Sequence, residues 1–317
     1  MPKRFETNPP ANCRLGLMRP ALALIAISLL LATACADSKK AENSSPKAIS
    51  AQVPPGPLDY ERHIAALKPK LKRLKEPFHI VIEAPFVVLG NGGEQDLKHA
   101  SEEIVRWTVE KLKQDFFKED PKRILDIWLF KDANTYQAHV YSLTGKKPTT
   151  PYGFYSSENS ALYMNINTGG GTLVHEIVHP YIEANFPKAP PWLNEGLGSL
   201  YEHSDERGGH IIGKPNWRLR GLKTAIADAR VPSFAALTSM DEYAFYGENS
   251  DVHYAAARYL LYYLQEQDLL LRFYHAFYEN READPTGYQT LVRVLGENDM
   301  PAFEKRWAAF VLGLSFP

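Results

Sequence analysis

Residues 169–202 read GGGTLVHEIVHPYIEANFPKAPPWLNEGLGSLYE, and this stretch decides both the fold and the chemistry of the chain. At its centre is a His-Glu-x-x-His pentad, in which His175 and His179 stand four residues apart and Glu176 follows the first histidine. On a helix, residues four apart project from the same face one turn apart, so two imidazoles can hold one metal ion. Glu176 then points to the neighbouring side, where it can take a proton from a metal-bound water.

A third metal ligand must come from outside the pentad. Glu183 lies on the same helix but about 12 Å along its axis from His175, which is too far to share the ion. A site with three histidines would need a glycine where Ile182 stands and a histidine where Asn185 stands. Glu195 is left, in the sequence PWLNEGLGS. Zinc suits this set because it accepts imidazole nitrogen and carboxylate oxygen tetrahedrally and keeps one position for water.

Together the two motifs resemble those of the gluzincin zinc peptidases, in particular bacterial lipoproteins and exported proteins with a peptidase MA-like domain. That family carries His-Glu-x-x-His on one helix and Asn-Glu-Gly, or a relative of it, at the start of a second, and the match covers residues 175–202. The resemblance implies a zincin-like α+β fold and a Zn2+ cofactor bound by His175, His179 and Glu195. It also implies that Glu176 is the general base, which activates water and then protonates the leaving amine.

The chain departs from the family pattern at two positions. Pro180 directly follows the second histidine, where it removes a backbone donor and is predicted to kink or end the helix. Ser199 stands where thermolysin-like relatives carry an aspartate that orients a histidine, so this support must come from elsewhere. Glu202 is one candidate for the role, although an exposed helix carboxylate is the favoured interpretation of that residue.

The resemblance further implies a tyrosine or histidine from a later helix that stabilises the oxyanion. Residues 246–254 contain the candidates. Tyr254 is the preferred catalytic residue there, with His253 and Tyr246 as alternatives, and packing within an aromatic helix is the competing interpretation.

The sequence pattern changes at the glycine run 169–171. Residues 58–170 alternate short β-type runs with helical segments, which predicts a mixed α/β subdomain ending in a hairpin of residues 152–155 and 161–166. The resemblance implies that an edge strand lines the cleft, and residues 161–166 suit that place; an ordinary internal strand is an equal alternative. Residues 171–317 predict a mainly helical subdomain that carries the zinc site and contains no strand pair.

The N-terminus is predicted to be an export signal. Basic residues precede an apolar run at residues 21–34, which is too short to span a bilayer, so residues 1–34 have the layout of a secretory signal peptide. The sequence ATAC at residues 32–35 resembles a bacterial lipobox with alanine in place of the usual leucine. That resemblance implies a lipid on Cys35; a soluble exported protein is the alternative.

Residues 35–57 are rich in Ser, Lys, Ala and Pro and are predicted to be a flexible tether. By resemblance, Ala36 after the lipidated cysteine favours the outer membrane, facing the periplasm. Translation from Met18 instead of Met1 is an open alternative, because residues 18–20 would themselves make a compact signal start.

Composition excludes several other classes of protein. Across 317 residues, 36 Lys+Arg stand against 37 Asp+Glu, so no net field would gather nucleic acid. A hydrophobic content of 44% excludes a mainly disordered chain. The 2 cysteines allow neither a disulfide scaffold nor a cysteine-ligated zinc finger.

The sequence therefore predicts a zinc-dependent metallopeptidase that cuts a peptide or protein substrate outside the cytoplasm. One alternative is a catalytically inactive, zincin-like lipoprotein that binds or assembles other proteins. Another is a zinc amidase that acts on cell-wall linkages. The sequence leaves open the substrate, endopeptidase against exopeptidase action, and the oligomeric state.

Overall fold

The computed structural model describes residues 58–316. The expected signal peptide of residues 1–34, the lipid on Cys35 and the tether of residues 35–57 lie outside the described residues, and stay predictions. Within the described part, no helix has both the length and the apolar character needed to cross a membrane.

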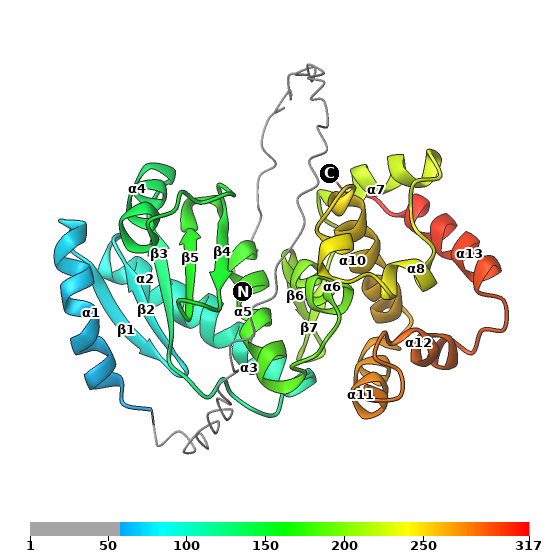
Figure 1. Cartoon of the computed structure of the whole chain (residues 1–317), viewed down its shortest axis with the longest axis horizontal. Coiled ribbons are helices and arrows are strands. Elements are labelled where there is room, and N and C mark those ends of the chain that lie inside the picture. The colour runs from blue at the N-terminus through cyan, green and yellow to red at the C-terminus, as the bar shows by residue number, and fades with distance from the viewer. Residues whose placement is uncertain (1–57, 317) are drawn as a thin grey trace, which may run out of the picture. The chain divides into compact units, whose positions relative to one another are not determined.

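A five-stranded sheet forms the N-terminal part, in the order β1-β2-β3-β5-β4 (Figure 1). The three central strands, β2, β3 and β5, run parallel, and the two outer strands, β1 and β4, pair with them antiparallel. The strands are β1 (His79–Glu83), β2 (Phe86–Gly90), β3 (Leu125–Phe130), β4 (Gly153–Ser156) and β5 (Ala161–Asn165).

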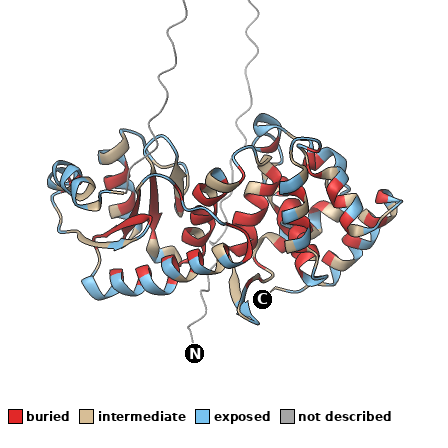
Figure 2. Ribbon diagram, turned by 90° about the horizontal axis from the view of Figure 1, so that it is seen from below, coloured by how far each residue is buried: buried red, intermediate tan, exposed pale blue. Residues whose placement is uncertain are grey.

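Helices cover both faces of this sheet. Alternate side chains of each strand point to opposite faces, so each strand packs against helices on both sides. On β2, Val87 and Leu89 pack in one apolar cluster with helices α1 (Tyr60–Leu74) and α4 (Ala133–Thr144). Phe86 and Val88 face the other side. There they pack with α2 (Glu94–Ala100), the π-helical segment Ser101–Arg106, α3 (Trp107–Asp115) and α5 (Gly171–Asn185). Figure 2 shows the strands and the inward faces of the helices as buried.

The prediction of a hairpin before the pentad is confirmed, but its edge strand is the other one. Residues 161–166 were one candidate for the edge; the structure places β5 between β3 and β4, so it is internal and β4 forms the edge. The cause is visible in the side chains, since Ala161 to Met164 are all buried, as a strand covered on both faces requires. In β4, by contrast, Phe154, Tyr155 and Ser156 are partly exposed.

The part after the sheet is mainly helical, so the predicted α+β class is confirmed. Its long central helix, α10, packs against α6 and α7. The helices that follow α5 are α6 (Pro191–Tyr201), α7 (Arg218–Ala227), α8 (Phe234–Thr238), α9 (Glu242–Phe245), α10 (Ser250–Glu266), α11 (Leu270–Asn280), α12 (Tyr288–Leu295) and α13 (Met300–Gly313). The boundary expected at residues 170 and 171 stays a prediction.

One strand pair interrupts the helical part, where the sequence pattern predicted none. β6 (Ser204–Arg207) and β7 (His210–Gly213) form an antiparallel hairpin. Its turn is Gly208-Gly209, with φ of 62° and 89°, a backbone that favours glycine. The sequence of β6 is polar and lacks the apolar alternation typical of a strand. The Gly-Gly pair was the signal that could have predicted the hairpin turn.

The helix that carries the pentad passes through Pro180 and continues to Asn185. Pro180 was predicted to kink or end the helix, and it does not end it. Val178, Tyr181 and Ile182 around it are buried against the sheet. This packing offsets the backbone hydrogen bond that the proline cannot make.

Candidate metal centre

Helix α5 presents the two histidines of the pentad toward α6. Leu173, Val174 and Ile177 are buried in the core that α5 shares with the sheet. This fixes the rotation of the helix and turns His175 and His179 to the other side, where their ring centroids lie 4.9 Å apart. The apolar residues of the motif thus aim its two imidazoles.

Helix α6 brings the third side chain of the group. Pro191 opens the helix at its first position, a conformation that proline favours. Gly198 allows α6 to approach α5 closely, because a Cβ there would lie 3.0 Å from Nε2 of His175. Gly196 faces the other way, where a Cβ would lie 2.9 Å from a methyl carbon of Leu261 on α10. The two glycines of the motif let α6 pack between two helices.

The three residues predicted as metal ligands converge. Oε2 of Glu195 lies 3.2 Å from Nε2 of His175 and 3.9 Å from Nε2 of His179. One donor atom from each residue falls within 4.8 Å of the other two. His175 and Glu195 are each only 6% exposed. Among residues 58–316, no other group of three or more His, Cys, Asp or Glu side chains is gathered in this way.

Two imidazoles and one carboxylate with this spacing form a group that can hold a metal ion. Both histidine rings offer Nε2 toward the same carboxylate oxygen. The remaining ring nitrogens face other polar groups, which is how metal-binding histidines are normally held. The donor set and its geometry therefore fit a metal ion.

Glu176 lies beside this group without being one of its three donors. Its Oε2 accepts a hydrogen bond from the backbone N–H of Tyr155 on β4 at 2.9 Å and lies 3.8 Å from Nε2 of His179. Burial raises the pKa of the Glu176 carboxyl, partly offset by the two histidines of the pentad.

Glu202 supports His175 from behind, and this overturns the favoured interpretation of an exposed carboxylate. Its side chain is buried, with Oε1 at 3.0 Å from Nδ1 of His175. Arg218 holds the same carboxylate at both oxygens, with Nη2 at 2.7 Å and Nε at 3.0 Å. Asn216 donates a third hydrogen bond at 3.2 Å. Glu202 thus takes the place left empty by Ser199, whose hydroxyl donates to the backbone of its own helix.

Asn194 performs the matching task for His179, which the sequence analysis did not predict. Its Oδ1 lies 2.9 Å from Nδ1 of His179, so that ring nitrogen can donate to the amide oxygen while Nε2 faces Glu195. The signal was present in the Asn-Glu-Gly motif, where Asn194 directly precedes Glu195.

The three aromatic candidates for the oxyanion differ in position. The hydroxyl of Tyr246 donates to Oε1 of Glu195 at 2.7 Å. Tyr254 lies nearby, 6.2 Å from the Tyr246 ring between centroids, and the guanidinium of Arg218 stacks on it at 5.2 Å. Nδ1 of His253 pairs with the backbone oxygen of Phe245 at 3.0 Å, so its ring fixes the segment before α10.

The electrostatics of the group favour a cation at its centre. Burial disfavours a charged imidazole, yet the contacts with Glu195 and Glu202 raise the pKa of His175 to about 10. Burial likewise opposes an ionised Glu195, but His179 and His175 lower the pKa of that carboxyl to about 2. A metal ion bound at Nε2 of His175 would replace the proton that these contacts favour on that ring.

No protein-family model matches the chain, and no curated protein matches it either.

Proposed function

We propose that this protein is a zinc-dependent metallopeptidase that hydrolyses peptide bonds outside the cytoplasm. The observation that carries the proposal is the convergence of His175, His179 and Glu195 within 4.8 Å, with the buried carboxylate of Glu176 beside them. Two imidazoles and a carboxylate with a neighbouring general base are the side chains that metal-assisted hydrolysis of an amide needs.

Zinc is the metal that suits this donor set best, because it takes nitrogen and oxygen ligands tetrahedrally. Bound by His175, His179 and Glu195, it would polarise the scissile carbonyl and lower the pKa of water at the remaining position. Glu202 and Asn194 would hold the two imidazoles in the orientation that presents Nε2 to the ion.

Glu176 would act as the general base. Its Oε2 is held by the Tyr155 N–H, which leaves Oε1 to accept a proton from the attacking water. Because burial raises its pKa, the carboxylate is a stronger base than an exposed glutamate. The same carboxyl then gives the proton to the leaving amine, so the base is regenerated in each cycle.

Strand β4 would hold the substrate as an added strand. The backbone oxygen of Tyr152 accepts a hydrogen bond from the N–H of Asn165 at 2.8 Å. In an antiparallel pair such bonds alternate, so the backbone groups of Gly153 and Tyr155 point away from β5. The N–H of Tyr155 is taken by Glu176, which leaves the N–H and C=O of Gly153 and the C=O of Tyr155 for a peptide. An extended peptide can pair with these groups antiparallel to β4, which brings it past Glu176.

Tyr246 is the side chain best placed to stabilise the oxyanion. Its hydroxyl reaches Glu195, and the residue is 45% exposed, so a ligand at the metal centre can contact it from solvent. Tyr254, the residue preferred on the sequence alone, packs against Arg218, also interacts with Glu195 and stays the second candidate. The choice between these two residues is open to a direct test.

The site of action outside the cytoplasm is proposed on the sequence alone. The export signal and the lipobox would place the protein in the bacterial cell envelope, anchored through Cys35, where peptide or protein substrates meet it. These segments lie outside the described residues, and the proposal for the zinc site does not depend on them.

Cleavage of a casein-like substrate tests the proposal. We expect zinc-loaded protein to cleave it, and Glu176→Gln to bind zinc equally while losing activity by about 100-fold or more. Glu279→Gln, an exposed glutamate on α11, serves as the matched control and should keep full activity. Zinc binding without cleavage of any peptide would instead favour the binding or assembly lipoprotein, and cleavage of cell-wall fragments alone would favour the amidase.

A further inference from the structure

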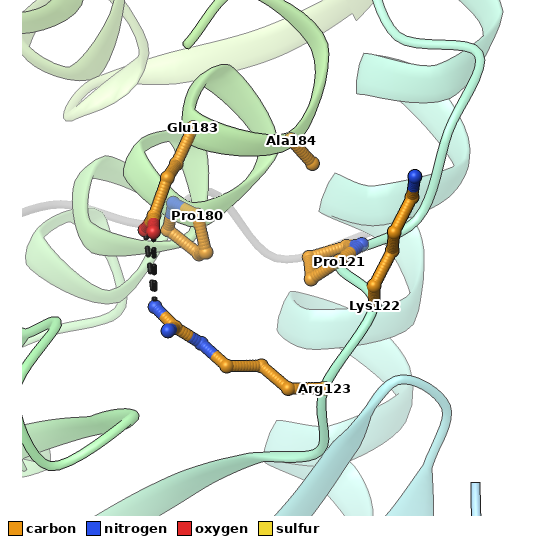
Figure 3. A pocket seen from close by; sticks show the side chains of 6 residues that line it. All are labelled: Pro121, Lys122, Arg123, Pro180, Glu183 and Ala184. Carbon is orange, nitrogen blue, oxygen red and sulfur yellow. Dashed lines mark hydrogen bonds and ion pairs between the residues drawn. The ribbon is translucent and has the colours of Figure 1, made fainter. Parts of the chain in front are cut away.

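A pocket of about 340 Å³ lies beside the second half of α5 (Figure 3). One wall is the loop before β3 and the other is the helix turn that follows the pentad. The pocket is lined by Pro121, Lys122, Arg123, Pro180, Glu183 and Ala184. None of these residues belongs to the metal centre.

Tyr155 on the edge strand joins this pocket to the metal centre. Its backbone N–H is bonded to Glu176, and its hydroxyl donates to Oε2 of Glu183 at 2.9 Å. Nη2 of Arg123 donates to the same hydroxyl at 2.9 Å. One residue of the proposed substrate-binding strand therefore contacts both the proposed general base and the pocket.

The pocket lies along the path of a substrate paired with β4. Glu183 is one helical turn beyond His179 on nearly the same face of α5, which puts it about 9 Å along the axis from the midpoint of the two histidines. An extended peptide covers this distance in about three residues.

The direction of β4 decides which part of the substrate reaches the pocket. β4 ends at Ser156, which is level with the start of β3, and the pocket loop runs directly into that start. A peptide paired antiparallel to β4 runs the opposite way, so its N-terminal side lies at the pocket.

The pocket carries a surplus of positive charge. Lys122 and Arg123 stand against one carboxylate, Glu183, and that carboxylate is already held by Nη2 of Arg123 at 3.1 Å and by Tyr155. Within residues 58–316, no hydrogen bond or ion pair engages Nζ of Lys122 or Nε and Nη1 of Arg123. Three charged donor groups are thus available to a ligand, whereas the acceptor is occupied.

We propose that this pocket is a substrate subsite that accepts an acidic side chain, about two to three residues on the N-terminal side of the bond that is cleaved. The inference rests on the proposed peptidase function and names the class of peptide that the site prefers. Lys122 and Arg123 supply the positive charge, and Glu183 with Tyr155 fixes the Arg123 guanidinium in place.

Cleavage of paired synthetic peptides tests this subsite. Peptides that differ only by Glu or Lys at each of the four positions before the scissile bond are given to the zinc-loaded wild type, Lys122→Glu, Arg123→Gln and Lys118→Glu. We expect wild type to favour Glu over Lys at the second or third position by about three- to fivefold in kcat/KM, the size of a half-exposed ion pair. Lys122→Glu should abolish or reverse that preference, and Arg123→Gln should reduce it.

Lys118→Glu is the matched control, because it makes the same charge change in the same loop at an exposed residue that does not line the pocket. It should keep the wild-type preference. Equal cleavage of Glu and Lys peptides by wild type, or an unchanged preference in Lys122→Glu, would overturn the subsite while leaving the peptidase proposal intact. No cleavage of any peptide by wild type would overturn the peptidase proposal itself.

Discussion

The two ends of α6 carry two buried carboxylates that look alike and are held in different ways. Glu195 and Glu202 stand two helical turns apart and contact the two nitrogens of one imidazole, at 3.2 Å from Nε2 and 3.0 Å from Nδ1 of His175. Glu202 is also bound by Arg218 at both carboxylate oxygens, whereas Glu195 contacts the two histidines and the hydroxyl of Tyr246 and forms no ion pair with an arginine or lysine among the described residues. The charge of Glu202 is thus already neutralised by the protein, and that of Glu195 is available to an exchangeable cation.

This difference assigns a separate task to each end of the helix. Glu195, in the first half of the helix, offers a candidate metal ligand, and Glu202, at its C-terminal end, fixes the candidate ligand His175 on another helix. A burial pattern alone would not separate them, because both residues are 6% exposed. The side chains that contact Glu195 and Glu202 do distinguish the two residues. Substitutions at these residues and at their neighbours test the distinction, from the largest expected effect to the smallest.

Removing the negative charge of Glu195 should weaken zinc binding more than any other change. We expect Glu195→Gln to weaken zinc binding by about 1,000-fold, because one of three protein ligands supplies about a third of the 10–16 kcal/mol that structural zinc sites provide. Isothermal titration of zinc into the metal-free protein, against a chelator, measures this. Zinc affinity within a few-fold of wild type would show that Glu195 is no ligand.

Glu202 should contribute to the free energy of unfolding of the metal-free protein, and this contribution should disappear in acid. Burial opposes the ionisation of Glu202, but Arg218 and His175 lower its pKa to about 2. The carboxylate therefore binds a proton less readily in the folded protein than in the unfolded chain. Its contribution is therefore present above the unfolded pKa and is lost as pH falls toward 2.

Urea unfolding of wild type and Glu202→Gln between pH 6 and 2 measures this contribution. We expect the wild type to lose more stability than the variant over this range, by about 2–3 kcal/mol. Parallel pH profiles for the two proteins would contradict the buried ion pair with Arg218.

The same substitution should also weaken zinc binding, but less than loss of the ligand does. We expect Glu202→Gln to lower zinc affinity about 10- to 100-fold, because it loosens the orientation of His175 without removing a donor. Ser199→Ala is the control, since its hydroxyl donates only within α6 and its loss should leave zinc affinity unchanged. An effect of Glu202→Gln as large as that of Glu195→Gln would remove the distinction between the two ends of α6.

The smallest effect should come from the tyrosine that reaches Glu195. We expect Tyr246→Phe to lower kcat about tenfold with little change in KM, and Tyr254→Phe to change kcat less, because the Tyr246 hydroxyl lies 2.7 Å from Glu195 on an exposed residue, whereas Tyr254 is less exposed and packs against Arg218. Steady-state kinetics on one peptide decides between them. The reverse order would restore Tyr254 as the oxyanion residue.

The sequence could predict the candidate metal-binding group because that group rests on local periodicity. His175, Glu176 and His179 follow from helical spacing, and Glu195 follows from a short motif that starts the next helix. The α+β class was equally accessible, because residues 58–170 alternate strand and helix patterns and the rest is helical.

What the sequence could not predict depends on contacts between distant segments. From the sequence alone, Glu202 is predicted to be an exposed helix carboxylate. In the structure, the chain after β7 brings Arg218, 16 residues away, into contact with it. The order of β4 and β5 in the sheet depends on which strand β3 pairs with, and no local pattern states that. Likewise, the persistence of α5 beyond Pro180 comes from packing against the sheet, which outweighs the local effect of proline.

The central claim is that one zinc ion is held by His175, His179 and Glu195. X-ray absorption spectroscopy of the purified, zinc-loaded protein, together with Glu195→Gln, tests it most directly. We predict one zinc per chain with two imidazole nitrogens and carboxylate or water oxygens at about 2.0–2.2 Å, and the loss of one oxygen ligand in the variant. A zinc spectrum without the two imidazoles, or the same spectrum in both proteins, would contradict the account.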